Sequence, residues 1–385
     1  MKNYKEILEE TRPWAEETFK KLDAKLSKMT LRSGKKVVDG VDENGMHVER
    51  GITWWTNGFW GGLNWLMYNY TKNEDYRRTA EFSEVRMDEA LSNYTALHHD
   101  VGFMWHPLSG ASYALTKNED SKRRSLFAAS VLASRYVMDG NNGFIRAWNG
   151  KSVENYSIID CLMNLPLLYW ASDVIEDDRF KRIAMANADM CLEQHLRPDG
   201  SVIHIVDHNR DTGGIVKTLG GQGYCDGSSW SRGQAWALYG FTVSYMHTKE
   251  ERYLNAAKLV ANYYIANVCD DWLPRVDFRS PSTPVYYDAA GGMCAVCGLI
   301  ELAKLLPEDE GGMYMHGAVN LIKAMTERFV NFNPDTDDLV NFGTGYYPQK
   351  GMSQEVARLH ISLIYSDYYF VEALLKLLEA DYFPW

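Results

Sequence analysis

The chain has 385 residues, with 40 Lys and Arg against 51 Asp and Glu, so its formal net charge is −11. An acidic chain without a run of basic residues is not expected to bind nucleic acid, because neutralising phosphates requires clustered cations. A hydrophobic content of 46% and a charged content of 24% exclude a disordered protein, and only 11 Pro residues favour helices. The 12 Trp, 24 Tyr and 14 Phe residues form an aromatic surplus that needs an explanation.

The first residues alternate charged and apolar side chains at helical spacing, without the apolar core of a signal peptide. No stretch reaches the roughly 18 apolar residues of a membrane span. The six cysteines fall mostly in apolar helical patterns, which is typical of reduced, buried thiols. Cys294 and Cys297 have the spacing of a redox or zinc pair, but no second ligand pair accompanies them, so we expect core packing. We therefore expect a cytoplasmic protein without a membrane segment.

Six segments begin with a cluster of small or polar residues and continue as an apolar helical run. They recur on average every 61 residues. A helix that is apolar on all sides must be buried, so these runs predict inner helices. The starts of the six runs are marked by Asn57, Gly110, Asp160, Gln234, Ala290 and Ser362.

Amphipathic helices with one charged face lie between these runs and predict an outer, solvent-facing layer. Six such alternating pairs predict an all-α fold, a closed (α/α)6 barrel. An open helical solenoid is the alternative, but the Gly- and Ala-rich inner starts and the lack of a polar capping repeat favour closure. No Gly/Ser-rich or Pro-rich linker divides the chain, so we expect one catalytic domain over residues 1–385. Predicted outer helices include 73–94, 121–138, 178–195, 249–268 and 317–332.

The insertion between the third and fourth inner runs is rich in loop signals. A turn at 197–201 precedes a strand-like run at 202–207, and a Gly-rich stretch follows at 213–227. Long loops at one rim of a barrel are where functional sites usually form. We therefore expect a site at this rim.

Many tryptophans gather at or just before the starts of the inner runs, beside Asn, Arg, Gln and His. A core spreads its aromatic residues along helices, whereas Trp faces stack on sugar rings and nearby polar groups bond the hydroxyls. As a set, these residues indicate a carbohydrate groove, although each one alone is more often a core residue. They are Trp54, Trp55, Trp60, Trp105, Trp148, Trp230 and Trp236.

Two carboxylates stand out as candidates for chemistry. Asp160 is flanked by apolar residues, and an unpaired ionised Asp there is costly, so it must be paired, protonated or functional. Asn164, four residues later, is a candidate hydrogen-bond partner. Asp100 enters an apolar stretch and could equally be a helix N-cap. Asp207 and Asp211 are not excluded by spacing, and Asp226 and Asp288 are the reserve candidates.

Other catalytic motifs are missing from the sequence. It has no Gly-x-Ser-x-Gly elbow, no P-loop and no His-Glu-x-x-His. The Gly-rich stretch at 220–223 has no surrounding strand–helix unit and is interpreted as a loop.

Taken together, the motifs resemble those of glycoside hydrolase family 88, the unsaturated glucuronyl hydrolases, over essentially the full chain. The resemblance implies an (α/α)6 barrel without a metal or organic cofactor. It also implies a substrate class, oligosaccharides that polysaccharide lyases leave with a 4,5-unsaturated uronic acid at the non-reducing end, including glycosaminoglycan fragments. The motifs that carry it are residues 54–62, 99–103, 158–164, 222–224 and 229–236.

The reaction that the resemblance implies is hydration of a vinyl ether. Carbon 4 is protonated, water adds at carbon 5, and the hemiketal opens to release the neighbouring sugar. Asp160 matches the family's general acid/base and Asp100 matches the second catalytic carboxylate. A proton donor must be neutral, which the apolar flanks of Asp160 favour, and an ionised Asp100 would stabilise positive charge at carbon 5.

Further residues match the family's substrate site. We expect Arg232 or His204 to offset the charge of the uronate, so that an acidic protein binds an acidic sugar through a local cation. Trp148 is an additional stacking candidate. The uronate subsite is matched by Asn57, His99, His204, Gln222 and Arg232, and the aromatic walls by Trp54, Trp230 and Trp236.

The substrate subtype is less defined by the sequence. The stretch 343–350 keeps Lys350 but has Gly345 and Pro348 where sulfate-binding serines would be expected, which argues against a strong preference for sulfated substrates. The alternatives are an unsaturated rhamnogalacturonyl hydrolase, a sugar 2-epimerase using His204 and His360, and a non-catalytic sugar-binding barrel. The oligomeric state stays open.

Overall fold

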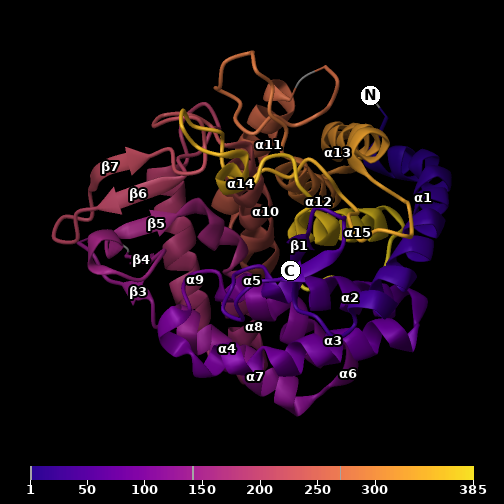
Figure 1. The fold of residues 1–385 in the computed structure, drawn as a ribbon. Coiled ribbons are helices and arrows are strands. Elements are labelled where there is room, and N and C mark those ends of the chain that lie inside the picture. The colour runs from indigo at the N-terminus through magenta and orange to yellow at the C-terminus, as the bar shows by residue number, and fades with distance from the viewer. Residues whose placement is uncertain (1, 141–142, 269) are drawn as a thin grey trace.

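Helices form two concentric layers in the computed structural model, which describes residues 2–140, 143–268 and 270–385 (Figure 1). Four inner helices begin at or near the predicted small or polar clusters, whereas the second segment begins earlier, at Val101, and the third later, at Pro166. Almost every side chain of the last three is buried. The second inner segment is continuous through a π-helical turn. The inner segments are α2 (Asn57–Thr71), α5 (Val101–Trp105) with η2 (His106–Gly110) and α6 (Ala111–Thr116), α8 (Pro166–Ile175), α10 (Ser231–Thr248), α12 (Ala289–Leu305) and α15 (Ile364–Leu377).

The outer helices are amphipathic, and their starts carry clear capping signals. The side chains of Asn73 and Asn118 accept backbone N–H groups at two helix starts, and Asn3 with Glu6 forms a capping box at a third. The helix over 4–33 completes the outer layer. The outer helices are α1 (Tyr4–Ser33), α3 (Glu74–Arg86), α7 (Glu119–Ala133), α9 (Arg179–Met190), α11 (Glu251–Asn267) and α13 (Glu308–Phe329).

The inner layer closes on itself. Each inner segment packs on the next, and the last, α15, packs on the first, α2. In Figure 1 the chain can be followed around the ring from indigo α1 to yellow α15, which also contacts α1. Gly58 shows how tight this packing is, because a Cβ atom there would lie 2.3 Å from the carbonyl oxygen of Met104. The (α/α)6 barrel is confirmed, and the open solenoid was wrong.

Short strands and single turns connect the helices. The predicted strand at 202–207 is present but begins later, and it pairs with the strand that leads into Asp160. The strands are β1 (Val38–Val41), β2 (His47–Glu49), β3 (Tyr136–Val137), β4 (Phe144–Ile145), β5 (Tyr156–Ile158), β6 (Ile205–His208) and β7 (Ile215–Leu219). The remaining helical turns are α4 (Asp88–Ser92), η1 (Tyr94–Ala96), η3 (Lys151–Val153), η4 (Ile159–Met163), η5 (Cys191–His195) and α14 (Gln354–Ala357).

The cysteines and hydrophobic stretches agree with the core assignments. Cys294 and Cys297 are free and buried in α12, as core packing predicts, and Cys269 lies outside the described residues. In the part of the chain that the structure describes, no helix combines the length and apolar character needed to cross a membrane.

Candidate active site

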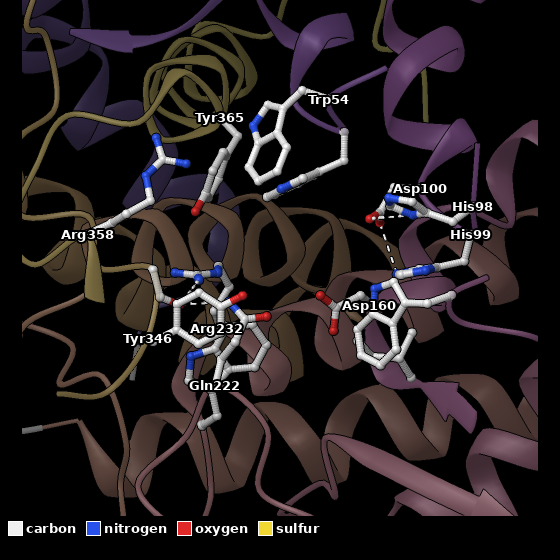
Figure 2. A pocket seen from close by; sticks show the side chains of 15 residues that line it. Trp54, His98, His99, Asp100, Asp160, Gln222, Arg232, Tyr346, Arg358 and Tyr365 are labelled. Carbon is white, nitrogen blue, oxygen red and sulfur yellow. Dashed lines mark hydrogen bonds and ion pairs between the residues drawn. The ribbon is translucent and has the colours of Figure 1, made fainter. Parts of the chain in front are cut away.

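A cavity of about 320 Å³ opens where the starts of several inner segments meet (Figure 2). Figure 2 shows Asp100 and Asp160 on one side of this cavity and Arg232, Tyr346 and Arg358 on the other. The wall comes from loops that are far apart in sequence, as expected at the rim of a barrel. The cavity is lined by Trp54, Trp55, His98, His99, Asp100, Trp148, Ile158, Asp160, Gln222, Trp230, Arg232, Gly345, Tyr346, Arg358 and Tyr365.

Asp100 lies between two imidazole rings. Its Oδ1 is 3.2 Å from Nε2 of His99, and its Oδ2 is 3.3 Å from Nδ1 of His98. Burial, reinforced by the charge of Asp160, raises the pKa of Asp100 well above its usual value, and burial holds the pKa of His99 well below its usual value. Asp100 is the residue before α5 but caps no backbone N–H with its side chain. The raised pKa favours a neutral Asp100 carboxyl, which can donate to His99, whereas an ionised carboxylate was expected from the sequence.

The sequence predicts Asp160 on an inner α-helix. In the structure it lies instead on a short 3-10 helix, η4, between β5 and α8. Pro166 begins α8 only after this turn. The Oδ1 atom of Asp160 faces Nε2 of His204 at 3.4 Å. The His204 ring is fixed from behind, because its Nδ1 lies 3.1 Å from the backbone N–H of Gln222.

Asn164 connects the two acidic residues. Its amide nitrogen lies 3.4 Å from Oδ1 of Asp100 and 3.2 Å from the backbone carbonyl oxygen of Asp160. Its amide oxygen accepts the N–H of Phe103 at 2.8 Å. The predicted partner of Asp160 thus bonds its main chain and the side chain of Asp100, rather than its carboxylate. This bridge couples η4 to α5.

Arg232 has its charge balanced inside the protein. Its guanidinium donates to Oδ2 of Asp288 at 2.5 Å and to the carbonyl oxygens of Thr344 and Gly345, and it lies 4.5 Å from the centre of the Trp230 ring. Both Arg232 and Asp288 are buried. The expectation that Arg232 is a free local cation is therefore corrected, and the reserve acid Asp288 is its partner.

The other reserve acid, Asp226, also has a structural contact. Its Oδ1 accepts the N–H of Gly220 at 2.7 Å and so closes the Gly-rich loop. Gln222, on the same loop, reaches the cavity and donates to the carbonyl oxygen of Gly345 at 2.7 Å.

Three of the four predicted aromatic contacts lie on the cavity wall, namely Trp54, Trp148 and Trp230. Trp236 does not, because its side chain is fully buried and packs against Phe103. Its position in the second turn of α10 explains the error, since only the first turn meets the cavity.

Asn57 and His204 are also absent from the residues that line the cavity. The amide of Asn57 donates to the carbonyl oxygens of Gly51 and Ile52, so it fixes the loop before α2. His204 is buried behind Trp230, with ring centres 4.3 Å apart, and faces Asp160 from there.

Several wall residues were missed from the sequence. Tyr365 starts the sixth inner helix, so the pattern that placed this helix could have pointed to it. Arg358 and Tyr346 lie in an irregular loop that carries no periodic signal. Lys350 is exposed at the far end of this loop and does not line the cavity. The missed residues are His98, Ile158, Gly345, Tyr346, Arg358 and Tyr365.

His98, His99 and Asp100 each present one possible ligand atom, and these atoms lie within 4.8 Å of one another. Such a group of donors could hold a transition metal. The close approach of the Asp100 carboxyl to both rings, at 3.2 and 3.3 Å, accounts for the same proximity.

A closed barrel of helix pairs with two carboxylates and four tryptophans in its rim cavity defines a carbohydrate-active enzyme of the (α/α)6 class. The chain is 33% identical over 344 residues to the unsaturated glucuronyl hydrolase of Bacillus sp. strain GL1, covering 87% of this chain and 89% of that protein. It is 31% identical over 332 residues to the unsaturated chondroitin disaccharide hydrolase of Streptococcus pneumoniae, covering 84% and 82%.

Solved structures agree with these relatives, although no family model matches the chain. The unsaturated glucuronyl hydrolase of Streptococcus agalactiae superposes with a TM-score of 0.89 at 27% identity, covering 97% of this chain and 94% of that one. The chain belongs to the unsaturated glucuronyl hydrolases.

Proposed function

We propose that the protein releases 4,5-unsaturated glucuronic acid from the non-reducing end of oligosaccharides produced by polysaccharide lyases. The observation that carries this proposal is the pair Asp100 and Asp160, joined through Asn164 and facing one aromatic-walled cavity. One similar solved protein, at 25% identity and a TM-score of 0.80, is in complex with dGlcA-GalNAc6S. This supports a glycosaminoglycan-derived disaccharide as the substrate class.

The proposed reaction begins with a proton transfer from Asp160 to carbon 4 of the unsaturated ring. The double-bond electrons form the new C–H bond and leave positive charge at carbon 5, shared with the ring oxygen. Water adds at carbon 5 and gives its proton to the Asp160 carboxylate, which restores the acid. The resulting hemiketal opens and expels the neighbouring sugar.

Asp100 and His99 serve this cycle as a second proton-holding pair. Asp160 lies close enough for its charge to help raise the pKa of Asp100. As positive charge develops at carbon 5, loss of the Asp100 proton toward His99 Nε2 would place a negative charge beside it. Burial thus favours a neutral Asp100, and the proposed proton transfer to His99 would ionise it when the positive charge develops.

The remaining polar and aromatic side chains are proposed to bind the sugar. Trp54, Trp148 and Trp230 provide flat faces for stacking. His99, Gln222 and Arg232 provide polar groups on the same walls. His204 acts from behind the wall by orienting Asp160.

The alternatives have less support. A sugar 2-epimerase using His204 and His360 is disfavoured, because Nε2 of His360 accepts the backbone N–H of Tyr287 and the residue is absent from the cavity wall. An unsaturated rhamnogalacturonyl hydrolase would share the barrel, but the curated relatives are named for glucuronyl and chondroitin substrates. Cytoplasmic location remains a proposal, which the buried free thiols favour.

The test uses an unsaturated uronyl disaccharide from a lyase digest. Hydration removes the conjugated double bond, so its ultraviolet absorbance should fall in the presence of the protein. Absorbance that stays constant with chondroitin-, hyaluronan-, heparin-, gellan- and xanthan-derived substrates would overturn the proposal.

A further inference from the structure

Asp39 is a buried carboxylate that binds groups from both sides of the cavity rim. Its side chain is 2% exposed, yet it lies on β1, outside the inner helices. Its Oδ1 accepts Nε1–H of Trp54 at 2.7 Å and the hydroxyl of Thr56 at 3.0 Å. Its Oδ2 accepts a guanidinium N–H from Arg358 and another from Arg50, each at 2.8 Å. Trp54 and Arg358, more than 300 positions apart in the chain, are thereby fixed to one group.

The charges at this wall do not balance. Two guanidinium groups share the single carboxylate of Asp39, which leaves one positive charge in excess. Arg232, by contrast, is matched one to one by Asp288. Arg358 lines the cavity and Arg50 lies outside it, with its guanidinium 4.8 Å from the centre of the Trp54 ring. Of the two guanidinium groups on Asp39, that of Arg358 borders the cavity, while that of Arg50 is turned to solvent with 45% of its side chain exposed.

Arg358 is placed to meet a ligand rather than to complete the core. Its side chain is 15% exposed, and among the described residues its ion pair with Asp39 uses only one guanidinium nitrogen, Nη2. Figure 2 shows it across the cavity from Asp100 and Asp160. A guanidinium with free N–H groups at a partly desolvated wall binds carboxylate or sulfate strongly.

We propose that Arg358, held in position by Asp39, selects substrates by binding an anionic group of the oligosaccharide. This anionic group is a carboxylate or a sulfate, and it is carried either by the unsaturated uronate or by the neighbouring sugar. Asp39 is a positioning residue, because it acts through Arg358 and Trp54. This assignment rests on the proposed function for its substrate class.

The test compares kcat/KM for three disaccharides that differ only in charge. The first has a free uronate carboxylate and no sulfate, the second has that carboxylate as a methyl ester, and the third adds a sulfate to the neighbouring sugar. Arg358→Gln is expected to lower kcat/KM at least about tenfold for a substrate that carries the contacted anion, and less than about twofold for the matched substrate without it. If the fold-loss differs between the free carboxylate and its methyl ester, Arg358 contacts the uronate. If it differs between the unsulfated and the sulfated disaccharide, Arg358 contacts the neighbouring sugar.

Three further variants separate binding from structure. Arg358→Lys should restore part of the discrimination, and Asp39→Asn should reduce it while raising KM more than it lowers kcat. Arg50→Gln removes the guanidinium outside the cavity and is the matched control. This variant should discriminate between the three substrates as the parent does. An equal fold-loss for Arg358→Gln on all three substrates would overturn the proposal, because a merely structural residue affects every substrate alike.

Calorimetric binding of the same three compounds gives this comparison without turnover. A parent protein that binds them selectively through Arg358 but hydrolyses none would contradict the proposed function and support the role of Arg358. A parent and an Arg358→Gln variant that bind all three with the same ratios of affinity would overturn that role.

Discussion

The Nε2 atom of His99 lies 3.2 Å from Oδ1 of Asp100, while Nδ1 of the same ring lies 2.6 Å from the carbonyl oxygen of Ala147. A carbonyl oxygen only accepts, so the proton of the neutral ring is on Nδ1, and Nε2 presents a lone pair to Asp100. The pKa of Asp100, raised by burial, leaves a proton there to be donated. This arrangement places a hydrogen-bond acceptor, Nε2 of His99, directly beside the Asp100 carboxyl group.

Replacing Asp160 with Asn should remove turnover while keeping the fold. The amide is nearly isosteric with the carboxyl group but cannot deliver a proton to carbon, so we expect kcat to fall by about 10²- to 10⁴-fold with KM within a few-fold. Progress curves of ultraviolet absorbance measure the rate, and circular dichroism checks the fold. A variant within a few-fold of the parent kcat would remove Asp160 from its role.

The two tryptophans Trp148 and Trp236 should respond differently to truncation. Trp148→Ala should raise KM by about 2- to 10-fold, because one stacking face on the cavity wall is lost. Trp236→Ala should cost about 3–5 kcal/mol of stability, because its side chain is fully buried among inner helices. Thermal unfolding and steady-state kinetics on both variants check the contrast. A Trp236→Ala protein as stable as the parent would contradict the core assignment.

Breaking the pair of Arg232 and Asp288 should be strongly destabilising. Asp288→Asn leaves a buried guanidinium without its counter-charge, and we expect a loss of about 3–5 kcal/mol. The double variant Arg232→Met with Asp288→Leu should recover much of this stability, because it removes both charges. Denaturant unfolding measures all three proteins. Equal stability of the single and double variants would show that the missing counter-charge is not the cause.

Stability should fall as the pH drops from about 6.5 to about 4. On β5, the hydroxyl of Ser157 lies 2.8 Å from Nε2 of His195 and 2.7 Å from Nε2 of His208. Burial lowers the pKa of His195 to about 3 and that of His208 to about 4. The unfolded chain binds protons from about pH 6.5 downward, whereas these folded rings do not until lower pH. The two neutral rings therefore make their full contribution to the free energy of unfolding above pH 6.5, and this contribution is lost as the pH falls.

The variant His208→Gln tests this linkage, because Gln can bond Ser157 but cannot take up a proton in this range. Near pH 5, the free energy of unfolding of this variant should change with pH less steeply than that of the parent, by about 1.4 kcal/mol per pH unit. His316→Gln, at an exposed position on α13, is the control and should keep the parent slope. Parallel pH curves for the parent and His208→Gln would refute the linkage.

Metal removal and metal addition should affect activity differently. A chelator should leave the rate unchanged, because the proposed reaction uses only protons and water. Added Zn²⁺ should inhibit, since His98, His99 and Asp100 offer three donors and the bound ion would displace the proton of Asp100. Rate measurements with chelator and with Zn²⁺ check both effects. A rate lost on chelation and restored by metal would contradict the proposed mechanism.

The sequence predicts the barrel well because burial on all sides and helical spacing are local, repeated signals. The six starts from Asn57 to Ser362 therefore fall at or near the observed inner segments. Site residues next to these starts, such as Asp100 and Trp230, could be predicted for the same reason. Trp236 was misassigned because periodicity does not tell the first turn from the second. Arg358 and the charge balance of Arg232 depend on contacts across distant segments, which no local pattern contains.

The bridge made by Asn164 joins the side chain of Asp100 to the main chain of Asp160, and both lie far in sequence from the late loop that carries Tyr346 and Arg358. In the proposed roles, proton transfer and substrate selection therefore draw on different segments of the chain. Exchanging the loop over residues 343–361 offers a route to new substrate ranges, both for natural divergence and for engineering, because the proton-transfer apparatus would be inherited intact.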